Sequence, residues 1–246
     1  MDQLVILLDI DNTLYRDKEH GGILHQMQEG LVEYVANFLQ LSPQEAEAYV
    51  AHCYEKYGLT ITGLVQEHKG LDIQAVTDFL YSRCDFSQLP EDPGLREVLS
   101  RLRQNHHIYY LTNAPRRHAA TVLERIGLSA DELIMHGFTY EDQWAHTAPM
   151  ICNKPHRNTY TAVMDAVSKG LRYAEKLTAD CMVMVDDTAS NLLEPLALGW
   201  NAVWVSHGNL IPDTLLEHMN TGKLFLMKDS SELEDVIGQV KLKINQ

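Results

Sequence analysis

The sequence has few of the features that mark secreted proteins, proteins with a structural metal site, or membrane-spanning proteins. Four cysteines are present, none of them in a Cys-x-x-Cys pair: Cys53, Cys84, Cys152 and Cys181. We therefore expect no disulfide framework and no zinc site, and a reducing compartment suits these thiols. The apolar stretch near the N-terminus is five residues long before Asp9 and follows no basic segment. Because this is too short for a signal peptide or a membrane span, we expect a soluble cytoplasmic protein.

Basic residues are also scarce. The chain has 20 Lys and Arg against 34 Asp and Glu, which gives a formal net charge of -14. A surface this acidic repels nucleic-acid phosphates and anionic membranes, so neither is an expected partner. A small phosphate ester is still allowed, because it responds to a local cluster of charges. With 246 residues and no internal repeat, the chain is long enough to bury a sizeable core.

Two carboxylates follow an apolar stretch at the start of the chain. Residues 4 to 8 are Leu-Val-Ile-Leu-Leu, and Asp9 and Asp11 come directly after them. In a strand, residues two apart share a face, so both carboxylates are predicted to point the same way. Such a pair can hold a hard cation and leave one oxygen free for attack. Taken alone, the pair is equally well interpreted as a turn after a buried strand.

The hydrophobic pattern divides the chain into two parts. Helical periodicity runs through residues 16–88, including a capping box at Ser42-Pro43-Gln44-Glu45 that Gly58 closes. From Pro90 onward, helical and strand-like segments alternate, which predicts a parallel sheet. Strands are expected at 107–111, 133–138, 181–185 and 202–205, with helices between them. We therefore predict an α/β core of residues 1–15 and 89–246 and an all-helical insert of residues 16–88.

Polar groups fall where strands of this sheet are predicted to end. Thr112 and Asn113 precede a helix, where a hydroxyl and free backbone N–H groups can cradle a phosphate. Asp186 and Asp187 follow another strand, and their mutual repulsion favours a cation there. Lys154 lies between these two elements in sequence. Each has a simpler interpretation alone: an N-cap for Thr112, a loop start for the acids and a solvated charge for Lys154.

Taken in order, these elements resemble the haloacid dehalogenase superfamily. Four motifs carry the resemblance: Asp9-Ile10-Asp11-Asn12-Thr13, Leu111-Thr112-Asn113, Asn153-Lys154-Pro155 and Val185-Asp186-Asp187-Thr188. The resemblance implies a Rossmann-like, doubly wound parallel sheet, and it makes residues 16–88 similar to that superfamily's helical cap.

The resemblance also implies roles for these residues. Asp9 would be the nucleophile that forms an aspartyl-phosphate, and Asp11 would be the general acid and base. Asp9, Asp11 through its backbone carbonyl, and Asp187 would bind Mg²⁺, with Asp186 supporting them. The phosphate would be held by three residues: Thr112, Asn113 and Lys154.

The fourth motif departs from the pattern of many relatives. Those proteins carry Gly-Asp and a further acid four residues beyond it, whereas this chain has Asp186-Asp187 and then Asn191. The acid that contacts the metal directly is therefore not assigned between Asp186 and Asp187, although Asp187 is preferred. The twelve histidines form no motif, so solvated or packed positions are expected for them.

Asp11 favours phosphoryl transfer, because the dehalogenases of this superfamily lack an acid two residues after the nucleophile. Within the phosphatases, three segments resemble pyrimidine 5'-nucleotidases, which act on UMP and CMP: residues 9–15, 57–64 and 185–188. A small phosphorylated metabolite, in particular a pyrimidine nucleotide, is thus the expected partner. Alternatives are a phosphatase of pyridoxal phosphate or sugar phosphates, a phosphosugar mutase, and a catalytically dead binding protein on the same scaffold.

Overall fold

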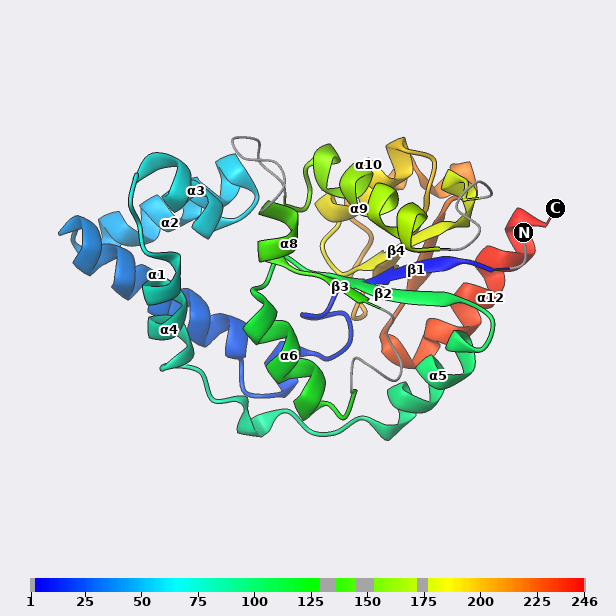
Figure 1. The fold of residues 1–246 in the computed structure, drawn as a ribbon, viewed down its shortest axis with the longest axis horizontal. Helices are drawn as coiled ribbons and strands as arrows, with labels where there is room; N and C mark the ends of the chain where they lie inside the picture. The colour runs from blue at the N-terminus through cyan, green and yellow to red at the C-terminus, as the bar shows by residue number, and fades with distance from the viewer. Residues whose placement is uncertain (1–2, 129–135, 145–152, 172–176, 246) are drawn as a thin grey trace. The chain divides into compact units, whose positions relative to one another are not determined.

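The computed structural model describes residues 3–128, 136–144, 153–171 and 177–245. Its contacts divide the chain into two compact units (Figure 1). The larger unit comprises Met1–Arg16 and Pro90–Gln246, and the smaller comprises Asp17–Leu89. In the described part of the chain, no helix has the length and apolar character needed to cross a bilayer.

The larger unit is built on one parallel sheet of six strands in the order β3-β2-β1-β4-β5-β6. The strands are β1 (Val5–Leu8), β2 (His107–Leu111), β3 (His136–Phe138), β4 (Met182–Asp186), β5 (Asn201–Val205) and β6 (Leu224–Met227). The winding reverses between β1 and β4, which is where ligands bind in sheets of this type, beyond the carboxyl ends of the strands. The predicted fold class, a doubly wound α/β sheet, is confirmed.

Helices cover both faces of this sheet (Figure 1). They are α5 (Pro93–Arg103), α6 (Arg116–Arg125), α8 (Tyr140–Trp144), α9 (Arg157–Gly170), α10 (Ser190–Ala197), α11 (Asp213–Leu216) and α12 (Leu233–Ile244). Alternate residues of β1, Val5 and Leu7, pack in one buried cluster with Tyr160 of α9 and Leu192 of α10. On the other face α5 and α12 contact β2 and β6. Because both faces are covered, β1 is apolar at every position.

The smaller unit is a separate helical bundle with its own core. It contains α1 (Ile23–Leu39), α2 (Pro43–Tyr57), α3 (Thr60–Glu67) and α4 (Ile73–Tyr81). The predicted capping box is present, with Ser42 and Glu45 bonding each other's backbone N–H, and Gly58 ends α2 at a φ of 72°. The helices enclose a buried apolar cluster of Leu31, Val35, Ala46, Val50, Leu64, Val76 and Leu80.

A few elements differ from the sequence-based expectation. Helix α3 begins at Thr60 and not at Thr62, where the helical pattern indicated its start, and Leu59 before it is extended, with no side-chain cap that could mark the start in the sequence. Helix α4 ends at Tyr81, and the hydroxyl of Ser82, the next residue, donates a hydrogen bond to Phe79 O. Residues 133–135 of the third predicted strand lie outside the described residues. Cys152 does so too, whereas Cys53, Cys84 and Cys181 form no disulfide in the part of the chain that the structure describes.

Candidate active site

The predicted site residues meet at the carboxyl ends of the three central strands, β2, β1 and β4. Asp9 directly follows β1, and its backbone N–H donates to Val185 O of β4 at 2.9 Å. Thr112 follows β2, and Asp186 is the last residue of β4. Parallel strands place these residues at one edge of the sheet, which is why elements far apart in sequence converge. The structure therefore brings together the acids, the Thr-Asn pair and the lysine.

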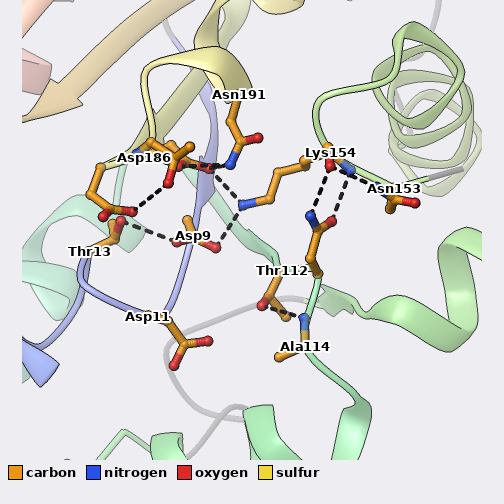
Figure 2. A network of polar contacts seen from close by, with 12 residues as sticks. Asp9, Asp11, Thr13, Thr112, Ala114, Asn153, Lys154, Asp186 and Asn191 are labelled. Carbon is orange, nitrogen blue, oxygen red and sulfur yellow. Dashed lines mark hydrogen bonds and ion pairs between the residues drawn. The ribbon is translucent and has the colours of Figure 1, made fainter. Parts of the chain in front are cut away.

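Lys154 lies at the centre of this cluster. Its Nζ is 2.7 Å from Asp9 Oδ1 and 2.6 Å from Asp186 Oδ2, and only 1% of the residue is exposed. Figure 2 shows the ammonium between the two carboxylates. Burial lowers the pKa of Lys154, but attraction to Asp186 and Asp9 outweighs burial and leaves that pKa above its ordinary value. The two carboxylates therefore favour the charged form of the lysine inside the site.

Asn113 anchors the backbone of Lys154. Its side-chain amide donates to Lys154 O at 2.9 Å and accepts from Lys154 N at 2.9 Å. Asn153 Nδ2 also donates to Lys154 O, at 2.8 Å. The Asn113 amide is thus committed to positioning the lysine. Thr112 is buried, and its hydroxyl accepts a hydrogen bond from Ala114 N at 3.0 Å, which orders the turn into α6.

The two adjacent acids of the fourth motif have different surroundings. Asp186 is buried and accepts hydrogen bonds from Lys154 Nζ, from Asn191 Nδ2 at 3.1 Å on both oxygens, and from Thr188 N at 2.9 Å. Within the described part of the chain, the Asp187 carboxylate accepts one hydrogen bond, from the Thr188 hydroxyl at 3.3 Å, while Trp204 Nε1 donates to its backbone carbonyl. Burial and the neighbouring Asp186 raise the pKa of Asp187 to about 7. The negative charge of Asp187 is thus offset by fewer hydrogen-bond donors than that of Asp186.

Asp9, Asp186 and Asp187 form a group that fits a hard cation. Each offers one carboxylate oxygen, and these three atoms all lie within 4.8 Å of one another. Burial raises the pKa of Asp9, and although Lys154 opposes this, repulsion from Asp186 and Asp187 adds to it. A divalent cation with a preference for carboxylate oxygen would remove that repulsion. The Asp11 carboxylate is not part of this group.

The Asp11 carboxylate has two partners that the sequence did not reveal. Its Oδ1 accepts from the Tyr15 hydroxyl at 2.6 Å and lies 2.7 Å from His118 Nε2 on α6. The pKa of Asp11 is lowered, because the charge and hydrogen bond of His118, with the bond from Tyr15, outweigh burial. His118 is 107 residues away along the chain, so only the fold brings it to this site.

Two further contacts were also missed. Asn191 holds Asp186 with its side-chain amide, at the position where many relatives have an acid. His207 lies after β5 with its Nε2 2.5 Å from the backbone oxygen of Asn12, and both residues have left-handed φ angles, 48° and 58°. The only available signal for Asn191 was its place four residues after Asp187 on the next helix. The sequence carried no comparable signal for His207.

The chain is similar to several known proteins in sequence or in fold. The chain is 26% identical to Phosphate metabolism protein 8 of Saccharomyces cerevisiae over 250 residues, which cover 93% of this chain and 71% of the yeast protein. A solved HAD phosphatase from Thermococcus onnurineus matches with a TM-score of 0.60 and 16% identity, over 96% of this chain and 98% of the other.

Two further solved structures share the fold. The putative HAD-hydrolase YfnB from Bacillus subtilis, bound to magnesium, gives a TM-score of 0.57 at 16% identity, over 96% of this chain and 99% of that protein. A putative beta-phosphoglucomutase from Thermotoga maritima gives 0.58 at 15% identity, over 97% and 100% of the two chains. The model of the haloacid dehalogenase-like hydrolases matches residues 4–195. This chain therefore belongs to the haloacid dehalogenase-like hydrolase family.

Proposed function

We propose that this hydrolase cleaves phosphate monoesters, with Asp9 as the nucleophile. The observation that carries the proposal is the placement of Asp9 at the end of β1, 2.7 Å from the buried ammonium of Lys154. The lysine opposes the effect of burial on the Asp9 pKa and so favours the ionised form that can attack. The same positive charge can neutralise phosphoryl oxygens as charge shifts during transfer.

The three clustered acids, Asp9, Asp186 and Asp187, are proposed to hold Mg²⁺. Their oxygens match its preference for hard ligands. Burial raises the pKa values of Asp9 and Asp187, and repulsion between the neighbouring acids, which a cation would offset, raises them further. Bound there, the ion would reduce repulsion between the nucleophile and an anionic phosphate. Asp187 is proposed as the more direct ligand, since Asp186 is already occupied by Lys154 and Asn191.

The protein groups support a two-step reaction. An Asp9 oxygen attacks phosphorus, the bond from phosphorus to the ester oxygen breaks, and Asp11 gives a proton to that oxygen. Water then attacks the phosphorus of the aspartyl-phosphate and loses a proton to Asp11, which releases phosphate and restores both carboxyl groups. Thr112 and the backbone N–H groups at the start of α6 are proposed to bind the phosphoryl oxygens. Asn113 would contribute through its hold on Lys154.

The presence of an acid at position 11 favours hydrolysis of phosphate esters over hydrolysis of carbon–halogen bonds. An alkoxide is a poor leaving group and needs a proton, whereas a halide leaves without one. The phosphosugar mutase remains the second candidate, because a mutase would use the same four motifs; one solved structure that shares the fold is a putative beta-phosphoglucomutase. A mutase also needs a second phosphate site, and no part of the described chain supplies an evident one. Hydrolysis is therefore the preferred proposal.

For the substrate we propose a pyrimidine nucleoside 5'-monophosphate, on the resemblance of residues 9–15, 57–64 and 185–188 to pyrimidine 5'-nucleotidases. A panel of UMP, CMP, AMP, pyridoxal phosphate and glucose 6-phosphate tests this with purified protein and magnesium chloride. The expected result is phosphate release fastest from UMP and CMP, and none from the Asp9→Asn variant. Release from sugar phosphates or pyridoxal phosphate alone would overturn the nucleotidase assignment. No release from any ester would favour a binding protein.

A further inference from the structure

The Asp11 carboxylate is held asymmetrically. Oδ1 accepts from the Tyr15 hydroxyl at 2.6 Å and from His118 Nε2, in its N–H form, at 2.7 Å. Within the described residues, Oδ2 has no hydrogen-bond partner. The His118 side chain is fully buried, and that of Asp11 is 15% exposed. One oxygen is thus fixed by the protein and the other is open.

We propose that His118 and Tyr15 are positioning residues that hold Asp11 by Oδ1 so that Oδ2 carries the proton given to the leaving group. This inference rests on the proposed phosphatase function. Two hydrogen bonds occupy the acceptor sites of Oδ1, so a proton on Asp11 resides on Oδ2. After the proton leaves, both donors stabilise the resulting carboxylate, and Oδ2 is ready to accept a proton from the attacking water.

Both donors lie on segments that also carry other residues of the site. Tyr15 lies four residues after Asp11, and the two form an isolated parallel bridge. His118 is on the first turn of α6, directly after the turn that Thr112 orders through its bond with Ala114 N. A movement of α6 would therefore displace the proposed phosphate-binding turn and the Asp11 anchor together. Proton transfer depends steeply on such placement, so loss of the anchor should reduce the rate.

If His118 and Tyr15 position a general acid, the effect of replacing them should depend on how much the leaving group needs a proton. If they only support the structure, the effect should be the same for every leaving group. A p-nitrophenolate leaves readily without a proton, whereas an alkoxide does not. The comparison uses kcat/KM, which covers the steps up to the aspartyl-phosphate, for p-nitrophenyl phosphate, phenyl phosphate and UMP. All measurements are made at one pH and with saturating magnesium. The variants are His118→Leu, His118→Gln and Tyr15→Phe.

For His118→Leu, kcat/KM for UMP should fall by about 10- to 100-fold, while that for p-nitrophenyl phosphate changes by less than about threefold. His118→Gln keeps an N–H donor near the Nε2 position and should recover most of the loss. Tyr15→Phe should show the same selectivity with a smaller loss. A matched control is His106→Gln, the same change at a buried histidine whose Nδ1 accepts from Leu4 N at the far end of β1. It should leave the ratio between substrates unchanged.

An equal loss on all three esters, or a faster rate with UMP, would overturn the inference while leaving the phosphatase proposal intact. Failure of the wild-type protein to hydrolyse any of the esters would instead overturn the proposed function, and the inference with it. Thermal unfolding of each variant shows whether it is folded. If His118→Leu does not fold, Tyr15→Phe and His118→Gln decide the question.

Discussion

At the scale of single residues, Lys154 determines the charge balance of the site. Three acids, Asp9, Asp186 and Asp187, lie close together at the ends of β1 and β4, and Lys154 bridges two of them. A buried charge without a partner is strongly unfavourable, so removing the lysine leaves carboxylates that repel each other. Lys154 is therefore expected to stabilise the folded protein even when no phosphate is bound, so this effect can be measured apart from its proposed role in binding phosphate.

Replacing Lys154 with Met is expected to reduce the free energy of unfolding by about 3–5 kcal/mol in the absence of metal. Urea denaturation in EDTA at pH 7 measures this. The control is Lys169→Met, which removes the exposed i,i+4 pair with Asp165 and should cost no more than about 0.5 kcal/mol. Equal, small effects of the two changes would contradict the proposed charge balance.

The raised pKa of Asp187, about 7, gives a pH dependence with a defined sign. The folded pKa lies above the ordinary value of about 4, so Asp187 stabilises the metal-free protein below pH 4, and this contribution is lost as pH rises through about 7. Mg²⁺ needs the ionised form, so its affinity should rise about tenfold from pH 6 to pH 8. Titration calorimetry measures this, and Asp187→Asn should reduce the pH dependence. A pH-independent affinity would contradict the assignment of Asp187 as a ligand.

The sequence predicted most of the residues that the structure brings together, but not their supports. Asp9, Thr112 and Asp186 were predictable because each directly follows an apolar stretch that the sequence marks as a strand. His118 was not, because its hydrogen bond to Asp11 joins residues 107 positions apart, and a histidine among buried apolar helix positions looks like ordinary packing. The roles of all these residues stay predictions until activity is measured.

At the scale of elements, α2 and α3 of the helical unit approach each other closely at Gly63. A Cβ added at Gly63 of α3 would lie 2.6 Å from Cys53 Cβ and 2.8 Å from Tyr57 Cδ2, both on α2. The Tyr57 hydroxyl also donates to Glu67 at 3.0 Å, which restricts the movement of its ring. Gly63 is thus required by the contact between two helices.

Gly63→Ala is expected to lower the free energy of unfolding of the helical unit by about 1–3 kcal/mol, because Cys53 Cβ cannot move without its backbone. Urea denaturation followed by circular dichroism measures the loss. Gly238→Ala on α12 is the control: nothing lies within 4 Å of its added Cβ, so it should stabilise by about 0.5–1 kcal/mol. A neutral or stabilising Gly63→Ala would show that α2 and α3 can separate without cost.

Elements with strong local signals were predicted best. The strand at His107–Leu111 and the capped start of α2 occur where the sequence indicated. Strand β6 and helix α12 were not predicted: the pattern of β6 is short, and Leu226 is 40% exposed at the edge of the sheet. The family resemblance implied a doubly wound parallel sheet, but the order of the strands was not predicted, since it depends on pairing between distant segments.

At the scale of the whole molecule, the net charge of -14 and the buried Lys154 affect an approaching anion at different distances. The acidic surface disfavours polyanions over distances of several ångströms, while Lys154 acts on a group in direct contact with it. A protein of this charge can therefore bind a small anionic ester at one cluster. This agrees with membership of a hydrolase family whose fold places the site at the ends of the central strands.

The central claim, that Asp9 attacks phosphorus, is tested most directly by trapping the intermediate. Protein turning over p-nitrophenyl phosphate with magnesium is quenched and treated with borohydride, which reduces an aspartyl-phosphate to homoserine, and the peptides are read by mass spectrometry. The account predicts homoserine at position 9 only when substrate and magnesium are both present, and none in Asp9→Asn. Turnover without modification of Asp9, or with homoserine at another aspartate, would contradict it.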